Sequence, residues 1–241
     1  MTYRLGVDVG GTADQSIGVL NGLARVCEHA GIDPKQISHV MHGTTVATNT
    51  VLTSTGARVG LVTTRGYRQV LQIARSFVPG GLGGWVIYNK SLPMAPLKLT
   101  IEADERVSAR GEVVRSLDEA ALRADLARLK GENIEALTVS LINAFANDAH
   151  EKRIRQVAAE VLPGVPVSLS SEVVPEMQEY ERTVTTVANS YVRPRVQRYV
   201  HNLQTKLASK AGSVKLHILR SDGGLSSARS AEDYPVNLLM S

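Results

Sequence analysis

The sequence predicts an α/β protein in which helices alternate with the strands of a layered sheet. From residue 58 onward, short apolar runs typical of strands alternate with longer segments of helical apolar periodicity. Twice, an expected strand runs into a turn with an acidic residue and two glycines, at residues 8–11 and 222–224. Hydrophobic residues make up 43% of the 241 residues and charged residues 21%, the profile of a globular protein with one large or two modest domains.

The composition excludes several classes of protein. Cys27 is the only cysteine, which excludes an intrachain disulfide and a cysteine-rich metal site. The 27 basic and 23 acidic residues leave a net charge of +4, and the basic residues are scattered along the sequence. Aromatic residues make up only 4%. Scattered positive charge and few aromatic residues together disfavour nucleic-acid binding. No apolar run is long enough to span a bilayer and no leader precedes the first strand, so we expect a cytoplasmic protein without a membrane partner.

The first strand and the turn after it form the first candidate for a ligand site. Residues 3–9 alternate as a short strand, and Gly10, Gly11 and Thr12 follow at once. Glycines let backbone N–H groups approach a ligand closely, and a concave row of amides binds anionic oxygens. Asp8 would hold a hydrated divalent cation or orient a water, and Thr12 would donate its hydroxyl to phosphate. The functional interpretation is a phosphate loop, and the alternative is a tight turn whose glycines serve geometry alone.

A second polar segment follows the second expected strand. The sequence predicts a helix over residues 14–31, a strand over 37–41 and another helix over 45–54. His42, Thr44 and Thr45 crowd hydrogen-bonding groups at this strand-to-helix junction, where a helix N-terminus presents unpaired N–H groups and positive potential. An anion or a polarised carbonyl would bind well there. The alternative is that one threonine caps the helix while His42 packs in the core.

The middle of the chain is expected to continue the alternation. The expected elements are a strand at 58–64, a helix to residue 75, a hairpin of 99–107 with 112–114, a helix from 119 to about 130, a strand at 135–143, a helix at 147–162 and a strand at 165–169. Ser116 and Glu119 form a capping box that would begin the second of these helices. Residues 78–96, with glycines around Trp85, are expected to be either a mobile loop over a pocket or an irregular connector.

The last third of the chain is expected to begin with a long helix over residues 171–211. Pro194 must kink or end this helix, and we place a boundary between two lobes there. A strand at 214–219 then leads into Asp222, Gly223 and Gly224. Because a strand runs into an acidic residue and two glycines for the second time, the phosphate interpretation of the first turn is favoured.

These motifs in combination resemble those of the hydantoinase A/oxoprolinase family. The resemblance rests on the segments Gly6–Thr12 (GVDVGGT), His42–Asn49 (HGTTVATN), Thr64–Tyr67 (TRGY), Ser171–Arg182 (SEVVPEMQEYER) and Ser221–Gly224 (SDGG). They are spread over nearly the whole chain in the expected order, and they are specific in combination although none is specific alone.

The resemblance implies the ribonuclease H-like, two-lobed ATPase fold of sugar kinases and actin, with the nucleotide in the cleft. Family members use ATP, accompanied by Mg²⁺, to phosphorylate a carbonyl, amide or enol oxygen of a small ketone or cyclic amide. A partner subunit of the hydantoinase B type then completes carboxylation or ring opening. The residues carried over are Asp8, His42 and Thr44 as catalytic residues, Asp8 also as metal ligand, and Gly10, Gly11, Thr12, Thr45, Asp222, Gly223 and Gly224 as nucleotide-binding residues.

One loop indicates the branch of the family. Residues 75–85 (RSFVPGGLGGW) look more like ketone carboxylases of the acetophenone type than like hydantoin or oxoproline hydrolases, which tend to be more polar here. We therefore expect a subunit of an ATP-dependent ketone carboxylase of the acetophenone or acetone type. The alternatives are an ATP-dependent cyclic-amide hydrolase of the N-methylhydantoinase or 5-oxoprolinase type, a non-catalytic nucleotide-binding scaffold module, and a small-molecule kinase.

The sequence departs from the family pattern in two places. The family carries Phe-Thr-Asp and two further strands after Gly-Gly-Thr, whereas here Thr12 leads into a helix, so a hairpin of roughly twenty residues is missing. At the other end, the chain stops at Ser241 where the family continues into the second lobe. We therefore expect residues 1–178 to form a nearly complete first lobe and residues 195–241 to begin a truncated ATPase domain. This piece alone is expected to bind nucleotide weakly and to turn nothing over.

Overall fold

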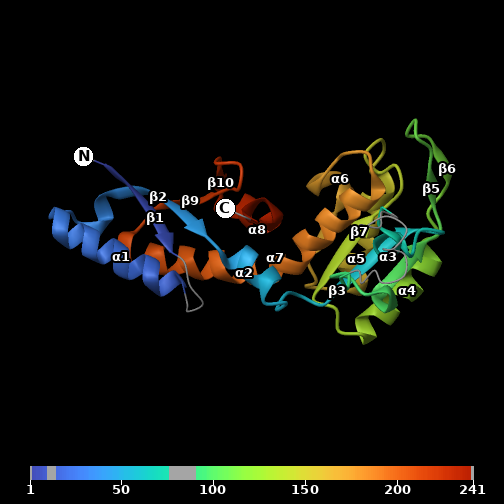
Figure 1. Ribbon diagram of the computed structural model, residues 1–241, viewed down its shortest axis with the longest axis horizontal. Helices are drawn as coiled ribbons and strands as arrows, with labels where there is room; N and C mark the ends of the chain where they lie inside the picture. Colours follow the sequence, from blue (N-terminus) through green and yellow to red (C-terminus); the bar gives the residue numbers. More distant parts are fainter. Residues whose placement is uncertain (1, 10–14, 76–90, 240–241) are drawn as a thin grey trace, which may run out of the picture. The chain divides into compact units, whose positions relative to one another are not determined.

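The computed structural model of the chain describes residues 2–9, 15–75 and 91–239. The contacts within the chain divide it into two compact units, and each is described by itself. Unit 1 consists of Met1–Gly56 and Val192–Ser241, and unit 2 of Ala57–Tyr191. Figure 1 shows that unit 1 holds β1, β2, β9 and β10, whereas unit 2 holds β3 and β7.

Unit 1 is built on a four-stranded sheet in the order β1-β2-β9-β10. Its strands are β1 (Tyr3–Val9), β2 (Ile37–Thr44), β9 (Lys215–Leu219) and β10 (Leu225–Ser227). β1, β2 and β9 run parallel, with Val9 opposite Thr44 at the ends of the first two, and β10 returns antiparallel to β9. The carboxyl ends of the three parallel strands therefore meet at one edge of the sheet.

Helices cover one face of this sheet. α1 (Gln15–Ala30) and the part of α7 that belongs to unit 1 run side by side (Figure 1), and Lys206 Nζ of α7 donates to Ser16 Oγ of α1 over 2.6 Å. Val40 and His42 of β2 are fully buried, whereas the neighbouring His39 is partly exposed, so the core of unit 1 lies on the helical face. The remaining elements are α2 (Val46–Leu52), α8 (Ala228–Asp233) and two 3₁₀ turns (Pro34–Gln36 and Pro235–Leu238).

Unit 2 is built on a four-stranded, wholly parallel sheet in the order β4-β3-β7-β8. Its strands are β3 (Val59–Thr64), β4 (Thr100–Ala103), β7 (Ala136–Ser140) and β8 (Val167–Leu169). Every residue of β3 and β7 is buried, as is usual where helices cover both faces of a parallel sheet. β5 (Arg106–Val107) and β6 (Val113–Arg115) form a separate antiparallel pair (Figure 1).

Two apolar cores lie on the two faces of the unit 2 sheet. α4 (Glu119–Gly131) and α5 (Ala149–Val161) contribute Leu122, Leu126 and Ile154 to one core. α3 (Val70–Ile73) and the first part of α7 (Glu179–Ala211) contribute Leu71 and Val187 to the other. A 3₁₀ turn (Leu97–Leu99) precedes β4, and α6 (Ser170–Val173) follows β8. The predicted alternation of strands and helices is confirmed.

The predicted hairpin of residues 99–107 with 112–114 is only partly correct. β4 pairs in parallel with β3 in the main sheet, and only Arg106 and Val107 pair with β6. The chain changes partner at Asp104 and Glu105, between the two strands. Apolar alternation marks both strands, but it does not reveal that the first of them pairs with a strand some forty residues earlier in the chain.

The long C-terminal helix differs from its prediction at its start. Residues 171–211 are divided into α6 and α7, with Pro175 in the gap. Of the two outcomes predicted for Pro194, an end of the helix is excluded, because Pro194 lies inside α7. A proline in a helix interior costs about 3 kcal/mol. Val192 and Val196 on either side are fully buried, and this burial offsets the cost.

The two units divide at a different place from the expected domains. The division falls between Tyr191 and Val192, and unit 1 takes segments from both ends of the chain. The expected domains, 1–178 and 195–241, follow family boundaries in the sequence and stay predictions.

The N-cap of α4 is Asp118, not Ser116. Asp118 Oδ1 accepts from Ala121 N over 3.0 Å, and Glu119 pairs with Arg153, so the predicted capping box is wrong. Replacing Asp118 by alanine is expected to lower the free energy of unfolding by about 1 kcal/mol, because the amide of the first turn loses its acceptor. Urea unfolding followed by circular dichroism measures this loss. Ser116→Ala should match the wild type, and an equal loss in both variants would contradict the assignment.

Candidate functional site

The predicted phosphate-binding residues follow the carboxyl ends of the parallel strands of unit 1. In the sequence, Gly10, Gly11 and Thr12 follow β1, Thr45 follows β2, and Arg220 to Gly224 follow β9. The first of these segments lies outside the described residues. The backbone of Asp8 lies opposite Gly43, next to the end of β1. Ligands of parallel sheets bind at this edge, so the described segments after β2 and β9 lie on the side of the sheet where a ligand is expected.

The turn between β9 and β10 already holds an anionic group of the protein. Asp222 Oδ1 accepts from Gly224 N over 2.9 Å, and Asp222 Oδ2 pairs with Arg220 Nη2 at 2.7 Å. Gly223 has φ +82°, which favours glycine, and a Cβ on Gly224 would lie 3.0 Å from Asp222 Oδ1. One amide and one guanidinium thus converge on a carboxylate. This is a donor set that also fits a phosphate oxygen.

His42 lies in the core of unit 1 with both ring nitrogens hydrogen-bonded. Its Nδ1 is 3.1 Å from Val7 O, and its Nε2 is 2.6 Å from Tyr199 Oη. A carbonyl only accepts, so Nδ1 carries the proton and donates to Val7. In the neutral ring, Nε2 then accepts from the Tyr199 hydroxyl. The ring joins β1, β2 and α7, which corresponds to the alternative that His42 packs in the core.

Removing the Tyr199 hydroxyl tests this arrangement. Tyr199→Phe is expected to lower the free energy of unfolding by about 1–3 kcal/mol, because the buried His42 Nε2 loses the hydrogen bond from the Tyr199 hydroxyl. Urea unfolding of Tyr199→Phe, His42→Phe and the double variant gives a double-mutant cycle. We expect the double variant to lose clearly less than the sum of the two single losses. Additive losses would show that the two side chains do not interact.

Thr44 and Thr45 use their hydroxyls around the start of α2. Thr44 is 1% exposed, and its Oγ1 accepts from Val46 N over 3.3 Å. Thr45 is the N-cap residue of α2, and its Oγ1 accepts from Asn49 Nδ2 over 3.2 Å. Both threonines therefore help to fix the turn that leaves the edge of the sheet.

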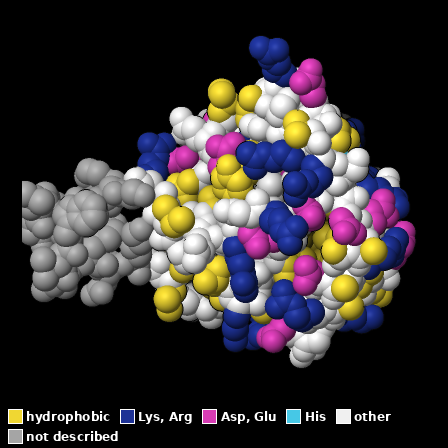
Figure 2. Space-filling view, turned by 90° about the vertical axis from the view of Figure 1, so that its right-hand side faces the viewer, with side chains coloured by type: hydrophobic (Ala, Val, Ile, Leu, Met, Phe, Trp, Pro, Cys, Tyr) yellow, Lys and Arg dark blue, Asp and Glu magenta, His cyan; other side chains and the backbone are white. Residues whose placement is uncertain are grey.

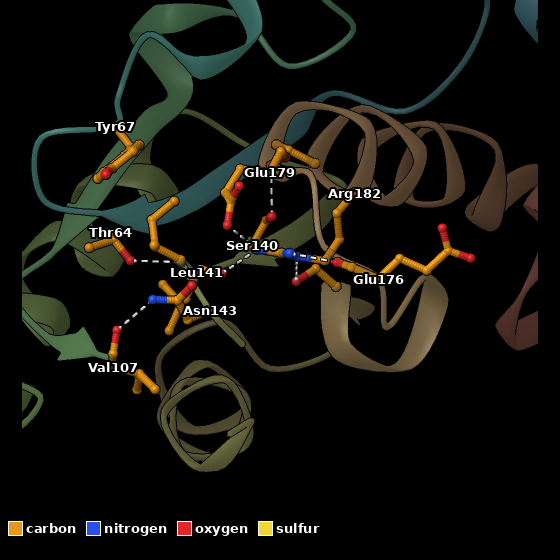
Figure 3. A network of polar contacts seen from close by, with 12 residues as sticks. Thr64, Tyr67, Val107, Ser140, Leu141, Asn143, Glu176, Glu179 and Arg182 are labelled. Carbon is orange, nitrogen blue, oxygen red and sulfur yellow. Dashed lines mark hydrogen bonds and ion pairs between the residues drawn. The ribbon is translucent and has the colours of Figure 1, made fainter. Parts of the chain in front are cut away.

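The carboxyl edge of the unit 2 sheet carries a buried polar network that the sequence did not reveal (Figure 3). At the end of β3, Thr64 Oγ1 donates to Glu105 and accepts from Ile142 N over 3.0 Å. Glu105 is 2% exposed, and its other oxygen lies 2.8 Å from His150 Nδ1. Asn143 Nδ2 donates to Val107 O over 2.9 Å. The segment after β7 is thereby fixed against the ends of β3 and β5.

Arg182 of α7 fixes the same segment from the other side (Figure 3). This side chain is 1% exposed, and its Nη2 and Nη1 donate to Leu141 O and Glu176 O, each over 2.8 Å. Its Nε donates to Ser170 Oγ, which itself donates to the buried Glu151. Burial raises the pKa of the Glu151 carboxyl, although three hydrogen bonds to its oxygens oppose that shift.

Comparison with known proteins shows to which family the chain belongs. A family model of the hydantoinase/oxoprolinase N-terminal region matches residues 11–162, and the hydantoinase/oxoprolinase model matches residues 182–241. The chain belongs to the hydantoinase/oxoprolinase family. Its relatives include the acetophenone carboxylase gamma subunit of Aromatoleum aromaticum, which is 32% identical over 88% of this chain and 31% of the relative.

Two solved structures share the fold of this family member. The crystal structure of the ATP-dependent caprolactamase from Pseudomonas jessenii matches with a TM-score of 0.84 and 27% identity over 98% of this chain and 38% of that one. A nucleotide-free acetone carboxylase matches with a TM-score of 0.81 and 19% identity over 95% of this chain and 35% of that one. The predicted fold class, the ATPase fold of sugar kinases and actin, is confirmed. The chain spans between 31% and 38% of the lengths of these three relatives.

Two properties of this family member concern ions and membranes. Among the described residues, no three His, Cys, Asp or Glu side chains are grouped so that they could hold a metal ion. Asp8 as a metal ligand therefore stays a prediction. No helix in the described ranges is long and apolar enough to cross a membrane.

The sequence motifs did not indicate which groups the side chains of Arg182 and Tyr199 hydrogen-bond in the folded chain. Arg182 ends a motif of the hydantoinase/oxoprolinase family, but nothing in that motif shows that its guanidinium is buried against Leu141. Tyr199 has no motif around it. Both residues bind groups far away in the chain, and only the folded structure makes such contacts visible.

Proposed function

We propose that this chain is the ATP-binding, substrate-activating part of an ATP-dependent enzyme, with a ketone carboxylase of the acetophenone or acetone type as the first candidate. The observation that carries the proposal is the edge shared by β1, β2 and β9, where the turn after β9 binds a carboxylate through an amide and a guanidinium. Two of the relatives, the caprolactamase and the acetone carboxylase, are ATP-dependent enzymes.

The residues of this edge suit a nucleotide bound with Mg²⁺. ATP would supply a phosphoryl group to a carbonyl or enol oxygen of the substrate, which would activate the carbon that bears this oxygen. Gly10, Gly11, Thr12 and Thr45 would hold phosphate oxygens, and Asp8 would hold the ion or orient a water. Asp222 would leave the amide of Gly224, so that a phosphate oxygen accepts from the donors that the carboxylate now uses.

His42 and Thr44 enter the proposal as residues that shape the site. Both are buried and hydrogen-bonded to neighbouring elements, which places the end of β2 and the start of α2. Their predicted catalytic roles would require the ring or the hydroxyl to exchange these partners when the substrate is bound.

The second candidate is an ATP-dependent cyclic-amide hydrolase, and a specific relative favours it. The caprolactamase matches 98% of this chain, whereas the acetophenone carboxylase subunit is the more identical in sequence. The loop that favours the carboxylase lies, except for Arg75, outside the described residues. In both candidates, a subunit of the hydantoinase B type would complete the reaction in the cytoplasm, and the small-molecule substrate would be a ketone or a cyclic amide.

A product assay on the full-length protein with its partner subunit separates the candidates. One reaction receives ATP, ¹³C-bicarbonate and acetophenone, and the other receives ATP with a hydantoin or 5-oxoproline. We expect a ¹³C-labelled keto acid in the first reaction and ADP or AMP formation that depends on the ketone. A ring-opened acid in the second reaction alone would establish the hydrolase, and no ATP turnover in either reaction would contradict the proposal.

A further inference from the structure

A pocket of about 720 Å³ opens at the carboxyl edge of the unit 2 sheet. Its walls include Tyr67, Val70 and Ile73 from the segment after β3, Asn143 from the segment after β7, Arg106 of β5 and Glu179 of α7. Figure 3 shows three of these residues, Tyr67, Asn143 and Glu179, on separate segments around the ends of β3 and β7. The volume is within the range of pockets that bind small organic molecules.

The topology of unit 2 places this pocket where parallel sheets bind ligands. In the order β4-β3-β7-β8, the chain leaves β3 toward β4 on one side and leaves β7 toward β8 on the other. Such a reversal opens a crevice outside the carboxyl ends of the two strands. Gly66 and Tyr67 follow β3, Ile142 and Asn143 follow β7, and all four line the pocket.

Positive φ angles, one of them strained, occur at the same place. Of the five described non-glycine residues with positive φ, Ala74 and Asn143 line the pocket, and Gln178 directly precedes Glu179. Ala74 has φ 53° and ψ −141°, a conformation that is costly for any residue other than glycine. Strain of this kind clusters at ligand sites, where the surrounding structure holds it in place.

Among the described residues, the charged side chain of the pocket wall without an ion pair is that of Arg106. The register of β5 against β6 shifts between Arg106 and Val107, and such a bulge changes the direction of a side chain. The Arg106 guanidinium lies 5.3 Å from the centre of the Tyr67 ring, and its Nη2 donates to Tyr67 Oη over 3.4 Å. The ring holds the guanidinium in place but does not neutralise its charge.

The two acidic residues of the pocket wall are paired with arginines. On the face of unit 2 that Figure 2 shows, basic and acidic side chains lie next to one another. The arginines near this edge pair as follows: Arg65 and Arg115 with Asp104, Arg75 with Glu181, and Arg182 with Glu179 at 3.7 Å. No ion pair joins Arg106 to a carboxylate within the described ranges of the chain. The two acidic residues of the wall, Glu179 and Glu181, thus have cations of their own.

We propose that this pocket binds a small carboxylate with an apolar body. The carboxylate would bind the Arg106 guanidinium, which matches it in geometry and charge. The body would lie against Val70, Ile73 and Ile142, and the Tyr67 hydroxyl and the Asn143 amide would bind polar atoms at its rim. All lining residues belong to unit 2 and none is a residue proposed to bind phosphate, so this inference does not depend on that proposal.

The test uses 4-bromobenzoate as the probe and the full-length protein. Isothermal titration calorimetry is expected to show binding, and the neutral amide of the same shape, 4-bromobenzamide, is expected to bind at least about tenfold more weakly. Arg106→Gln should weaken 4-bromobenzoate binding by about tenfold or more, because the charge that selects the carboxylate is lost. Arg110→Gln, an exposed arginine outside the pocket lining, is the matched control and should bind like the wild type.

Further measurements separate a loss of binding from a loss of folding and locate the bound probe. Circular dichroism of Arg106→Gln should match the wild type, and Tyr67→Phe, which keeps the ring, should weaken binding only a few-fold. The anomalous signal of bromine in a crystal of the complex should lie between Tyr67 and Ile73. No detectable binding, equal affinity of Arg106→Gln and Arg110→Gln, or bromine at another place would each overturn the proposal.

Discussion

Replacing Arg182 by alanine is expected to lower the free energy of unfolding by about 3–5 kcal/mol, the largest loss expected of any single substitution considered. The guanidinium is buried and donates to Leu141 O, Glu176 O and Ser170 Oγ. Alanine would leave these three acceptors without their donor inside the protein, and it would open a cavity the size of the lost side chain.

The loss would also reach the ligand pocket of unit 2. Leu141, whose carbonyl Arg182 holds, directly precedes Ile142 and Asn143 of the pocket wall. The buried Glu151, which accepts from Leu141 N and Ser170 Oγ, would lose a nearby positive charge.

Urea unfolding followed by circular dichroism measures this effect. Arg195→Ala is the matched control, because Arg195 lies on the same helix but is exposed, and it should change the free energy by less than about 0.5 kcal/mol. Arg182→Lys should lose an intermediate amount, since an ammonium cannot reach all three acceptors in the plane of a guanidinium. A loss for Arg182→Ala no larger than that of the control would show that the network does not hold unit 2 together.

Replacing Asp8 by alanine is expected to reduce ATP hydrolysis by the full-length complex by about 100- to 1,000-fold. Asp8 stands at the end of β1, one residue before the turn proposed to hold phosphate, and its backbone pairs with Gly43 of β2. A carboxylate at that position would hold the magnesium ion or the attacking water, and alanine can do neither.

Phosphate release measures ATP hydrolysis by the Asp8→Ala variant, and size-exclusion chromatography measures whether the variant still assembles with its partner subunit. Asp33→Ala is the control, because Asp33 is an exposed acid of the same unit that caps the 3₁₀ turn Pro34–Gln36, and it should retain activity. We expect Asp8→Ala to assemble with its partner subunit like the wild type. If Asp8→Ala hydrolysed ATP at the wild-type rate, Asp8 would have no part in the reaction, and the phosphate site proposed after β1 would be contradicted.

The sequence predicted the layered α/β architecture because its strand and helix periods are regular and locally determined. β3 and β7 are rich in apolar and β-branched residues, and they are the buried central strands of unit 2. The signals failed where the outcome depends on distant residues. β4 pairs with β3, and α7 continues past Pro194 because buried valines on both sides hold it.

The candidate sites could likewise be predicted only where their residues are close together in the sequence. The turn Asp222-Gly223-Gly224 was visible in the sequence because its glycines meet local needs of the backbone. The unit 2 pocket was not, because Tyr67, Arg106, Asn143 and Glu179 come from four separate segments. The hydroxyl of Tyr199 that binds His42 belongs to a helix more than 150 residues later in the chain.

The most direct test of the central claim is a crystal structure of the full-length complex with magnesium and a non-hydrolysable ATP analogue. The account predicts phosphate oxygens within hydrogen-bond distance of the Gly224 amide, with Asp222 displaced from it, and Asp8 beside the magnesium ion. Phosphates bound elsewhere, with the carboxylate of Asp222 still on Gly224 and the edge of β1, β2 and β9 without nucleotide, would contradict it.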